Sequence, residues 1–189
     1  QSSDYNGLQL TFQMRQWHNI SFNGFYTYSQ TMSSAQVMNN TTQGGAQNFV
    51  KLADEYGRAD TDQRHVFSLN MNWELDYYKG DNGFWGALLN GWAISPIVKI
   101  RSGLPFTVTN GNVDANLDGQ TNDRAQQIGD PSLDNPTPEQ WFNTAAFIQN
   151  KVVTGQPVDG NTPRNSLEGP GFRVVDLASS RDFRLPKGR

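Results

Sequence analysis

A run of oxygen-bearing side chains at alternate positions is the clearest chemical signal in the sequence. Hard oxygen ligands spaced in this way around a turning glycine are what Ca²⁺ prefers. An EF-hand would carry Glu at the twelfth position, where this chain has Ala125, so only a loop-type site is expected. The alternative is an Asx-turn loop whose side chains hydrogen-bond their own backbone. The candidate Ca²⁺ ligands, arranged around Gly119, are Asp114, Asn116, Asp118, Gln120, Asn122 and Asp123.

Other chemistry is sparse. The chain has no cysteine, which excludes disulfides, thiolate zinc sites, iron-sulfur clusters and cysteine nucleophiles. Its two histidines, His18 and His65, stand at turns or strand starts, and neither G-x-S-x-G nor H-E-x-x-H occurs. Glu74 and Asp76 share parity as a glycosidase pair would, but a polar strand face explains them more simply. We therefore expect no enzyme activity and no cofactor other than the candidate Ca²⁺.

Composition narrows the class of protein and of partner. Charged residues make up 17% of the 189 and aromatic residues 12%, so the polarity comes from uncharged Asn, Gln, Ser, Thr and Gly. This argues against a coiled coil, a charged disordered tail and a helix-rich enzyme. The net charge of -3 provides no basic field for nucleic acid. No window approaches the 18 or so consecutive apolar residues of a transmembrane helix.

Strict alternation of apolar and polar residues predicts about five β-strands. The clearest runs from Phe67 to Tyr77, with the odd positions apolar and the even positions polar. A fourth strand starts at Trp92, where Pro96 suggests a bulge or kink. The last is less regular, because Arg173, Ser179 and Arg181 share the parity of Val175 and Leu177. The predicted strands are residues 8–15, 20–29, 65–77, 92–101 and 173–185.

The connections between these strands alternate between short and long. The long ones lie near residues 30–64 and 110–171, whereas residues 16–19 and 78–91 form the shorter ones. Outer-membrane barrels have this asymmetry, with short periplasmic turns and long extracellular loops. A strand of about thirteen residues, tilted by about 45°, would also cross a hydrocarbon core of about 30 Å. A soluble β-sandwich would show the same alternation, but the loop asymmetry favours the barrel.

Aromatic and charged residues fit the same interpretation. Two separated sets resemble the girdles at the two membrane interfaces: Trp17, Tyr77, Tyr78, Trp85 and Trp92 near the short connections, and Tyr26 and Tyr28 near the long ones. Parity directs a set of charged residues toward a lumen, where they would line a transport path or stand as solvated wall charges: Arg15, Glu74, Asp76, Lys99 and Arg101. Thr137 and Pro138 predict one short loop helix, whose Trp141 and Phe142 are expected to pack the loop rather than grip a ligand.

Several short motifs follow one another in an order that resembles a known family. They include Tyr5-Asn6-Gly7-Leu8-Gln9, Tyr26-Thr27-Tyr28-Ser29, Tyr56-Gly57-Arg58, Asp62-Gln63-Arg64-His65, Gly91-Trp92-Ala93-Ile94-Ser95, Ser102-Gly103-Leu104-Pro105-Phe106-Thr107-Val108, Asn122-Asp123-Arg124, Trp141-Phe142-Asn143-Thr144-Ala145-Ala146-Phe147, Arg164-Asn165-Ser166-Leu167 and Gly169-Pro170-Gly171-Phe172. In this order they resemble the C-terminal barrel region of TonB-dependent outer-membrane receptors of the Oar-like kind, which carry a carboxypeptidase-regulatory-like extension.

The resemblance implies an all-β fold, namely antiparallel up-and-down strands forming part of a transmembrane β-barrel with long extracellular loops. Residues 1–189 would then be one partial barrel of about five strands, a fragment without its plug domain and closing strands. The implied function is ligand capture and uptake in the bacterial outer membrane. The implied partners are outer-membrane lipid or lipopolysaccharide, the rest of the barrel with its plug, and TonB. The alternative is a secreted or surface β-rich binding or adhesion module that depends on calcium.

Parity also predicts facing and register. One face should carry Leu10, Phe12, Phe22, Leu69, Met71, Trp73 and Ile94. Paired positions in the first hairpin must sum to an even number, for example Phe12 opposite Phe22 or Gly24, because a slip of one residue would put polar side chains into lipid. Across residues 78–91 the sums must be odd, so Trp73 should pair with an even position such as Ile94, Pro96 or Val98. A bulge at Pro96 would reset this rule beyond it.

Overall fold

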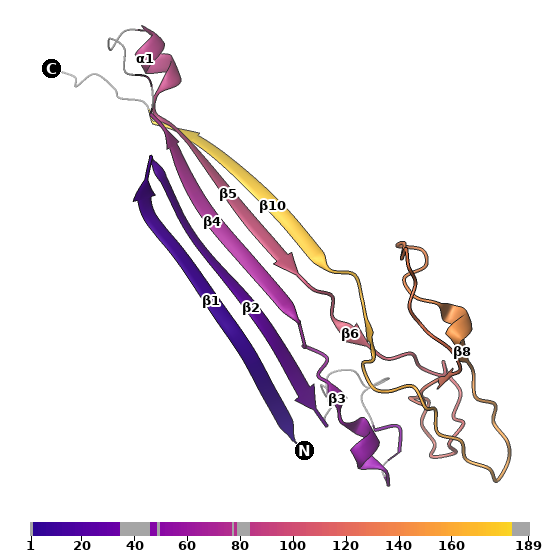
Figure 1. Ribbon diagram of the computed structural model, residues 1–189. Coiled ribbons are helices and arrows are strands. Elements are labelled where there is room, and N and C mark those ends of the chain that lie inside the picture. The colour runs from indigo at the N-terminus through magenta and orange to yellow at the C-terminus, as the bar shows by residue number, and fades with distance from the viewer. Residues whose placement is uncertain (1, 35–45, 49, 77, 79–83, 183–189) are drawn as a thin grey trace. The chain divides into compact units, whose positions relative to one another are not determined.

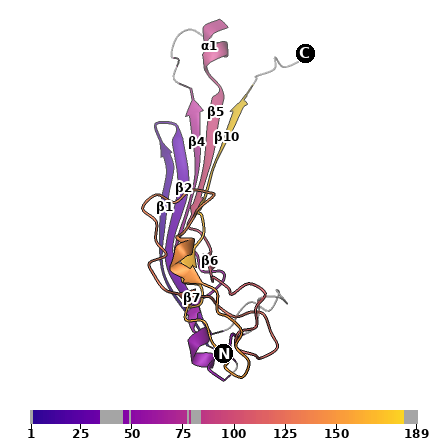
Figure 2. The ribbon, with the colours of Figure 1, turned by 90° about the vertical axis from the view of Figure 1, so that its right-hand side faces the viewer.

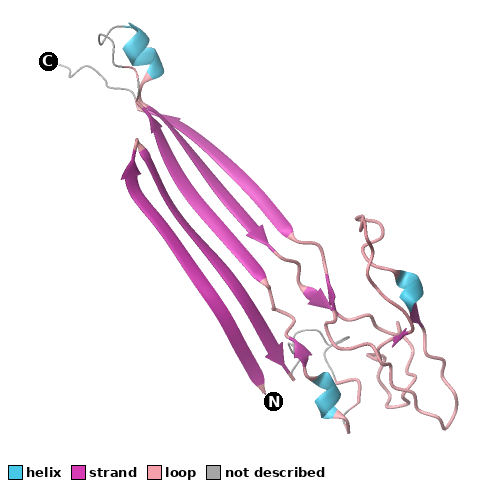
Figure 3. Ribbon diagram, viewed as in Figure 1, coloured by secondary structure: helices cyan, strands magenta, loops and turns pink. Residues whose placement is uncertain are grey.

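Long antiparallel strands dominate the structure, a computed structural model that describes residues 2–34, 46–48, 50–76, 78 and 84–182. Helix is confined to a few short turns (Figure 3). The chain folds as two compact units. One is a sheet unit of residues 8–28, 65–101 and 172–189, and the other is a loop unit of residues 1–7, 29–64 and 102–171. The long strands are β1 (Ser3–Trp17), β2 (Ile20–Ser33), β4 (His65–Leu75), β5 (Trp92–Arg101) and β10 (Phe172–Arg181).

The strands form a meander in which neighbours in the chain are neighbours in the sheet. Their order is β1-β2-β4-β5-β10, and the pairs β2–β4, β4–β5 and β5–β10 are antiparallel (Figure 1). From the side, the five strands form a single layer (Figure 2). β1 and β10 are the two edges, and the sheet does not close on itself within the described residues. The predicted all-β, up-and-down architecture is therefore confirmed as an open antiparallel sheet.

Two residues, His18 and Asn19, separate β1 from β2. Both adopt positive φ, at 49° and 64°. Asn tolerates this conformation better than most residues, because its short polar side chain can hydrogen-bond locally. The carbonyl of Asn19 also accepts a 2.9 Å hydrogen bond from the backbone N–H of Glu74, which ties the turn to β4.

The predicted facing is confirmed along β2, β4 and β5. Ile20 pairs with Trp73 and Phe22 with Met71 across β2 and β4, and Trp73 pairs with Ile94 in β5 as the parity rule requires. In the first hairpin, a Cβ added to Gly24 would lie 2.9 Å from the ring of Phe12. Phe12 therefore lies over Gly24 on the same face, as the even sum predicts.

The bulge expected at Pro96 is absent. β5 keeps one register with β4 on both sides of this residue, from Trp73 opposite Ile94 to Leu69 opposite Val98. Pro96 itself pairs with Leu177 of β10. The ladder to β4 is interrupted at Ser95 and Pro96, where the Ser95 hydroxyl donates a 2.8 Å hydrogen bond to the side-chain oxygen of Asn72. A side-chain bond thus spans the break, and no extra residue is needed.

The connections leave the sheet as predicted. Tyr28 pairs with His65, and Arg101 pairs with both Val66 and Phe172, so residues 34–64 and 102–171 leave from the same end of the sheet. The opposite end carries the His18–Asn19 turn and α1 (Phe84–Leu89). Small elements fill the long connections, namely η1 (Leu52–Glu55), β3 (Gly57–Arg58), β6 (Pro105–Phe106), β7 (Gln126–Gln127), η2 (Thr144–Ala146), β8 (Phe147–Ile148) and β9 (Leu167–Glu168).

The helix predicted at Thr137 is wrong. Thr137 does accept a hydrogen bond through its hydroxyl from the N–H of Gln140, as an N-cap would. Its own N–H, however, donates back to the carbonyl of Gln140, and the chain closes a turn instead of propagating a helix. The nearest helical turn, η2, begins later, at Thr144, behind the capping side chain of Asn143.

Within the described part of the chain, the apolar face of the sheet is largely exposed. Val175 and Leu177 are 69% and 70% exposed, and Leu8 and Leu10 are also exposed. Among the described residues the fully buried hydrophobic side chains are four alanines of the loop unit. A soluble sandwich would bury this face against a second sheet. No helix in the described part of the chain is long and apolar enough to cross a membrane.

Candidate functional site

The loop unit is held together by buried polar side chains. Arg164, only 3% exposed, donates to the backbone carbonyls of Ser33 (2.9 Å) and Glu55 (3.1 Å) and forms an ion pair with Asp60 at 3.2 Å. The first of these contacts joins positions 131 residues apart in the chain. Since an unpaired buried charge is costly, Arg164 fixes the relative positions of the two long connections within this unit.

Two further carboxylates continue this framework. Asp62 is fully buried, accepts from the N–H of Thr31 (2.7 Å) and is paired with Arg58 at 2.7 Å. Glu55 is ion-paired with the buried guanidinium of Arg124. Sequence reasoning missed this network, although Arg58, Asp62, Arg124 and Arg164 all lie in the motifs that carry the family resemblance. Their contacts link segments that are distant in the sequence, so no local spacing of residues predicts them.

The candidate Ca²⁺ loop lies within this unit, at residues 114–123. Asp114 accepts from the N–H groups of Asp118 (3.1 Å) and Gly119 (2.9 Å), and Asp118 accepts from the N–H of Gln120 at 2.9 Å. Gly119 has a φ of +86°, so the turning glycine stands where the pattern requires one. Asp123 accepts from the N–H groups of Ala115 (2.6 Å) and Asn116 (3.1 Å). The loop thus has the internal bonds of the Asx-turn alternative.

The six candidate Ca²⁺ ligands differ in how far they are buried. Asp123 and Asn116 are buried, Asp114 and Asn122 are half-buried, and Asp118 and Gln120 are exposed. The amide of Asn122 donates to the carbonyl of Ala46 at 3.0 Å, and that of Asn116 donates to the carbonyl of Gln47. Within the described residues, no three acidic or histidine side chains are already grouped as a metal cage. The Ca²⁺ assignment stays a prediction.

Burial changes the acidity of Asp123. Desolvation raises the pKa of its carboxyl, the N–H groups of Asn116 and Ala115 oppose that shift, and the negative charges of Asp118 and Asp114 raise the pKa further. Asp123 is therefore a carboxylate whose negative charge is poorly compensated.

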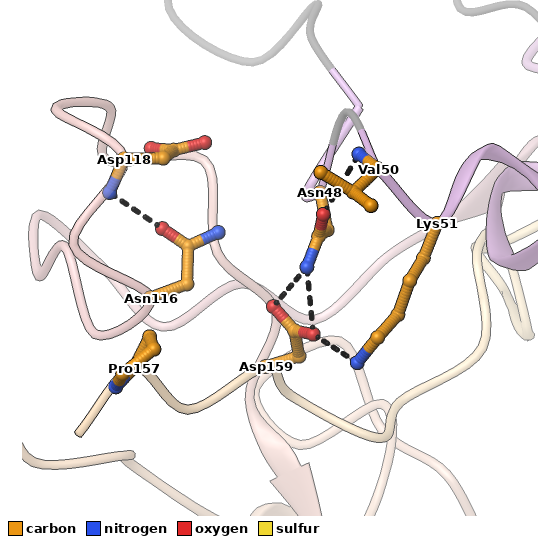
Figure 4. Close-up of a pocket in the computed structure, with 7 residues that line it drawn as sticks. All are labelled: Asn48, Val50, Lys51, Asn116, Asp118, Pro157 and Asp159. Carbon is orange, nitrogen blue, oxygen red and sulfur yellow. Dashed lines mark hydrogen bonds and ion pairs between the residues drawn. The ribbon is translucent and has the colours of Figure 1, made fainter.

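A cavity of about 360 Å³ opens beside this loop (Figure 4). Asp159 lies in its wall, where it forms a 2.8 Å ion pair with Lys51 and accepts from the amide of Asn48. Asn116 and Asp118 of the candidate loop line the other side. Except for these two, the lining residues were not predicted from sequence, because Lys51 and Asp159 lie 108 residues apart.

A second hollow of about 450 Å³ follows the polar face of the sheet. Neutral hydrogen-bonding side chains and the apolar residues Met14, Phe22, Met71 and Ile97 share its wall, and Arg15 is the cation among the lining residues. Its lining includes Gln13, Ser21, Asn23, Asn70, Asn72 and Ser95. Of the charges predicted for a lumen, Arg15 thus lies in this hollow. Glu74, Lys99 and Arg101 share the polar face by register, and Asp76 follows the end of β4.

The aromatic residues occupy the expected roles in part. Phe142 packs against Phe106 and Phe147, with ring centroids 5.7 Å apart in each case, and the indole of Trp141 donates to the carbonyl of Glu168 at 2.7 Å. Both therefore pack the loop, as expected. Near the short connections, Trp17, Trp85 and Trp92 are exposed, and Arg181 stacks on Trp92 at 5.1 Å. Tyr77, Phe183 and Leu185 lie outside the described residues.

Comparison with known proteins gives one family match. A family model described as "Outer membrane beta barrel domain" matches residues 1–189, the whole of the sequence. No curated protein and no solved structure matches the chain.

Proposed function

Because the chain belongs to the outer membrane beta barrel domain family, we propose that it is a barrel segment of a TonB-dependent outer-membrane transporter that captures and takes up a ligand. Membership itself gives the coarser statement that this is a β-barrel segment of an outer-membrane protein. The transport function and the coupling to TonB are the proposal.

The observation that carries the proposal is the contrast between the two faces of the sheet. One face exposes Leu10, Phe12 and Leu177 without a protein core behind it, which suits lipid. The opposite face carries the hollow, whose lining mixes amides, hydroxyls and Arg15 with apolar residues such as Ile97, and its polar groups suit a water-filled lumen. Neutral hydrogen-bonding groups in such a wall would let a polar solute pass without binding it too tightly to leave.

The loops supply the second argument. Residues 34–64 and 102–171 leave the sheet from one end, and short connections occupy the other. In outer-membrane barrels the long loops are extracellular. We assign ligand capture to this side, and the cavity between Lys51, Asp159 and Asp118 is a candidate contact surface. Outer-membrane lipid or lipopolysaccharide would surround the barrel, and the rest of the barrel with its plug would complete it.

Coupling to TonB is tested with the intact outer-membrane protein that carries this chain, purified in detergent. The periplasmic domain of TonB should bind it with one-to-one stoichiometry in calorimetry. A synthetic peptide copying the N-terminal segment of that protein should compete.

Lipid exposure is measured on the same preparation, so that the barrel assignment and the transport function are tested separately. A polarity-sensitive fluorophore at Leu10 should report lipid, and the same fluorophore at Gln13 should report water. If the labels report lipid and water as expected but TonB does not bind, the chain is a barrel segment and the TonB-dependent transport function is contradicted. A Leu10 label that reports water would contradict the facing itself.

A further inference from the structure

A buried carboxylate oxygen in the loop unit has no partner. Asp123 is 0% exposed, and its Oδ2 accepts the N–H groups of Ala115 and Asn116. Its Oδ1 is buried and accepts no hydrogen bond from the described residues, and the same holds for the side-chain oxygen of Asn122, the preceding residue in the chain. Buried polar atoms in native proteins are nearly always satisfied, so two unpartnered oxygens on consecutive residues point to a group that is missing from the protein alone.

The carboxylate of Asp123 bridges the two ends of the 114–123 loop. Its Oδ2 accepts from the backbone of Ala115 and Asn116, so the side chain reaches back to the start of the loop. The N–H of Asn116 donates to Asp123, and the side-chain oxygen of Asn116 accepts from the N–H of Asp118, which also donates to Asp114. Hydrogen bonds therefore link the Asp123 carboxylate, through Asn116, to the residues that carry two further carboxylates.

No cation of the described residues forms an ion pair with these three carboxylates, those of Asp114, Asp118 and Asp123. The adjacent Arg124 is directed to Glu55, and Lys51 is directed to Asp159. Three carboxylates in one short loop, one of them fully buried, are repulsive without a cation.

We propose that the 114–123 loop binds one Ca²⁺ ion, with the unpartnered oxygens of Asp123 and Asn122 as its buried ligands and Asp118 and Asp114 as its outer ones. Ca²⁺ suits this set because it takes six to eight oxygen ligands in a flexible geometry, whereas Mg²⁺ demands a near-octahedral one and keeps several waters. Carboxylate and amide oxygens without nitrogen or sulfur donors also disfavour zinc and copper.

The ligands must close on the ion, since the described part of the loop unit holds no ready cage of three acidic side chains. Asp118 is exposed, so its side chain has room to leave the N–H of Gln120 and turn inward. Asp114 already bonds the N–H of Gly119, which holds the turn in the shape that brings alternate side chains to one side. Because Asp118 and Asn116 also line the cavity with Lys51 and Asp159, the bound ion would fix one wall of that cavity.

The test is calorimetric titration of CaCl₂ into the intact outer-membrane protein, refolded in detergent so that no lipopolysaccharide contributes Ca²⁺ sites. We expect one site per chain with a dissociation constant of about 10⁻⁴ M, the range of extracellular calcium modules. Asp118→Ala should weaken binding at least about tenfold, because affinity in such loops follows the number of charged ligands. Asp123→Asn should also weaken it.

Asp134→Ala is the matched control, since Asp134 is an exposed aspartate elsewhere in the same connection. It should bind like the unmodified protein, and all variants should keep the heat-modifiable migration of a folded barrel. Asp118 is exposed, so its variant tests the site even where Asp123→Asn fails to fold. No saturable heat up to about 10 mM Ca²⁺, equal binding by Asp118→Ala, or an equal loss in Asp134→Ala would each overturn the proposal. Equal affinity for Mg²⁺ would overturn the choice of Ca²⁺.

Discussion

The facing of β4 can be tested with a single charge. Met71 is the seventh of the eleven residues of β4 and pairs with Phe22 on the apolar face. At about 3.3 Å per residue and a tilt of about 45°, each residue advances about 2.3 Å along the membrane normal, so β4 spans about 26 Å and Met71 lies about 2 Å from its middle. An arginine on the lipid face at the bilayer midplane costs about 2–4 kcal/mol. Met71→Arg should therefore lower the folding equilibrium constant by about 30- to 700-fold.

The neighbouring position is the matched control. Asn70 is the central residue of β4 and lines the hollow on the opposite face, where it pairs with Asn23 and Ile97. Asn70→Arg adds the same charge at the same depth but into water, so it should change the free energy of unfolding by less than about 1 kcal/mol. Met71→Leu keeps the site apolar and should also be nearly neutral.

The assay is reversible urea unfolding of the intact barrel in lipid vesicles, followed by tryptophan fluorescence. The difference between Met71→Arg and Asn70→Arg is the informative quantity, because it cancels the intrinsic propensity of arginine for a strand. Equal destabilisation by the two variants would mean that both faces meet the same medium. A larger loss from Asn70→Arg would mean that the faces are assigned the wrong way round.

The other predictions concern the loop unit. Gly103→Ala should destabilise the loop unit by about 1–3 kcal/mol, because the added Cβ would overlap a backbone carbonyl oxygen. Gly129→Ala is the control, since its added Cβ would meet only ordinary contacts. Limited proteolysis compares the stability of the two variants. Glu55→Gln leaves the buried guanidinium of Arg124 without its counter-charge and should cost about 3–5 kcal/mol, measured by the same proteolysis. Without Ca²⁺, the loop unit should become more stable as the pH falls through the raised pKa of Asp123, because the folded state then binds a proton that the unfolded state does not. Hydrogen exchange measured against pH would detect the added stability. The same pH dependence in Asp123→Asn would contradict this prediction.

Alternation made the sheet predictable. A strand has a side-chain period of two, so the parity of Phe67 to Leu75 fixes both the secondary structure and the face of each residue. Parity also restricts register to alternate positions, which is why Ile94 could be named, together with Pro96 and Val98, among the possible partners of Trp73. The observed β1 and β2 are longer than the alternating runs, because backbone pairing continues where side chains no longer alternate.

Two local signals failed for different reasons. Pro96 lacks an N–H, which favours a bulge, yet the Ser95–Asn72 bond holds the strands across that break, and Asn72 lies in another strand. Thr137 has the side chain of an N-cap, but the reciprocal backbone bonds with Gln140 in the same segment close a turn first. The first failure came from a tertiary contact, and the second from a choice between two local hydrogen-bond patterns.

The loop framework was beyond local prediction because of its chemistry. Hydrophobic periodicity reports elements that bury apolar faces, whereas the loop unit buries Arg164, Asp62 and Arg124 and only small alanines. Each such polar group is stabilising only while all its partners are present, since an unpaired buried charge costs more than a lost apolar contact.

The sheet unit exposes apolar side chains whereas the loop unit buries charged ones, and this difference supports a calcium site in the loop unit. The apolar face of the sheet can be satisfied by lipid, but the charge of the buried Asp123 carboxylate is neutralised only by a proton or a cation. At neutral pH a proton is scarce, whereas divalent cations gather at the anionic outer surface where we place these loops. A cation there would complete a framework whose other buried charges, at Glu55 and Asp62, already have arginine partners. The 114–123 loop is thus the one acidic segment of the described loop unit in which a buried carboxylate still lacks its counter-charge.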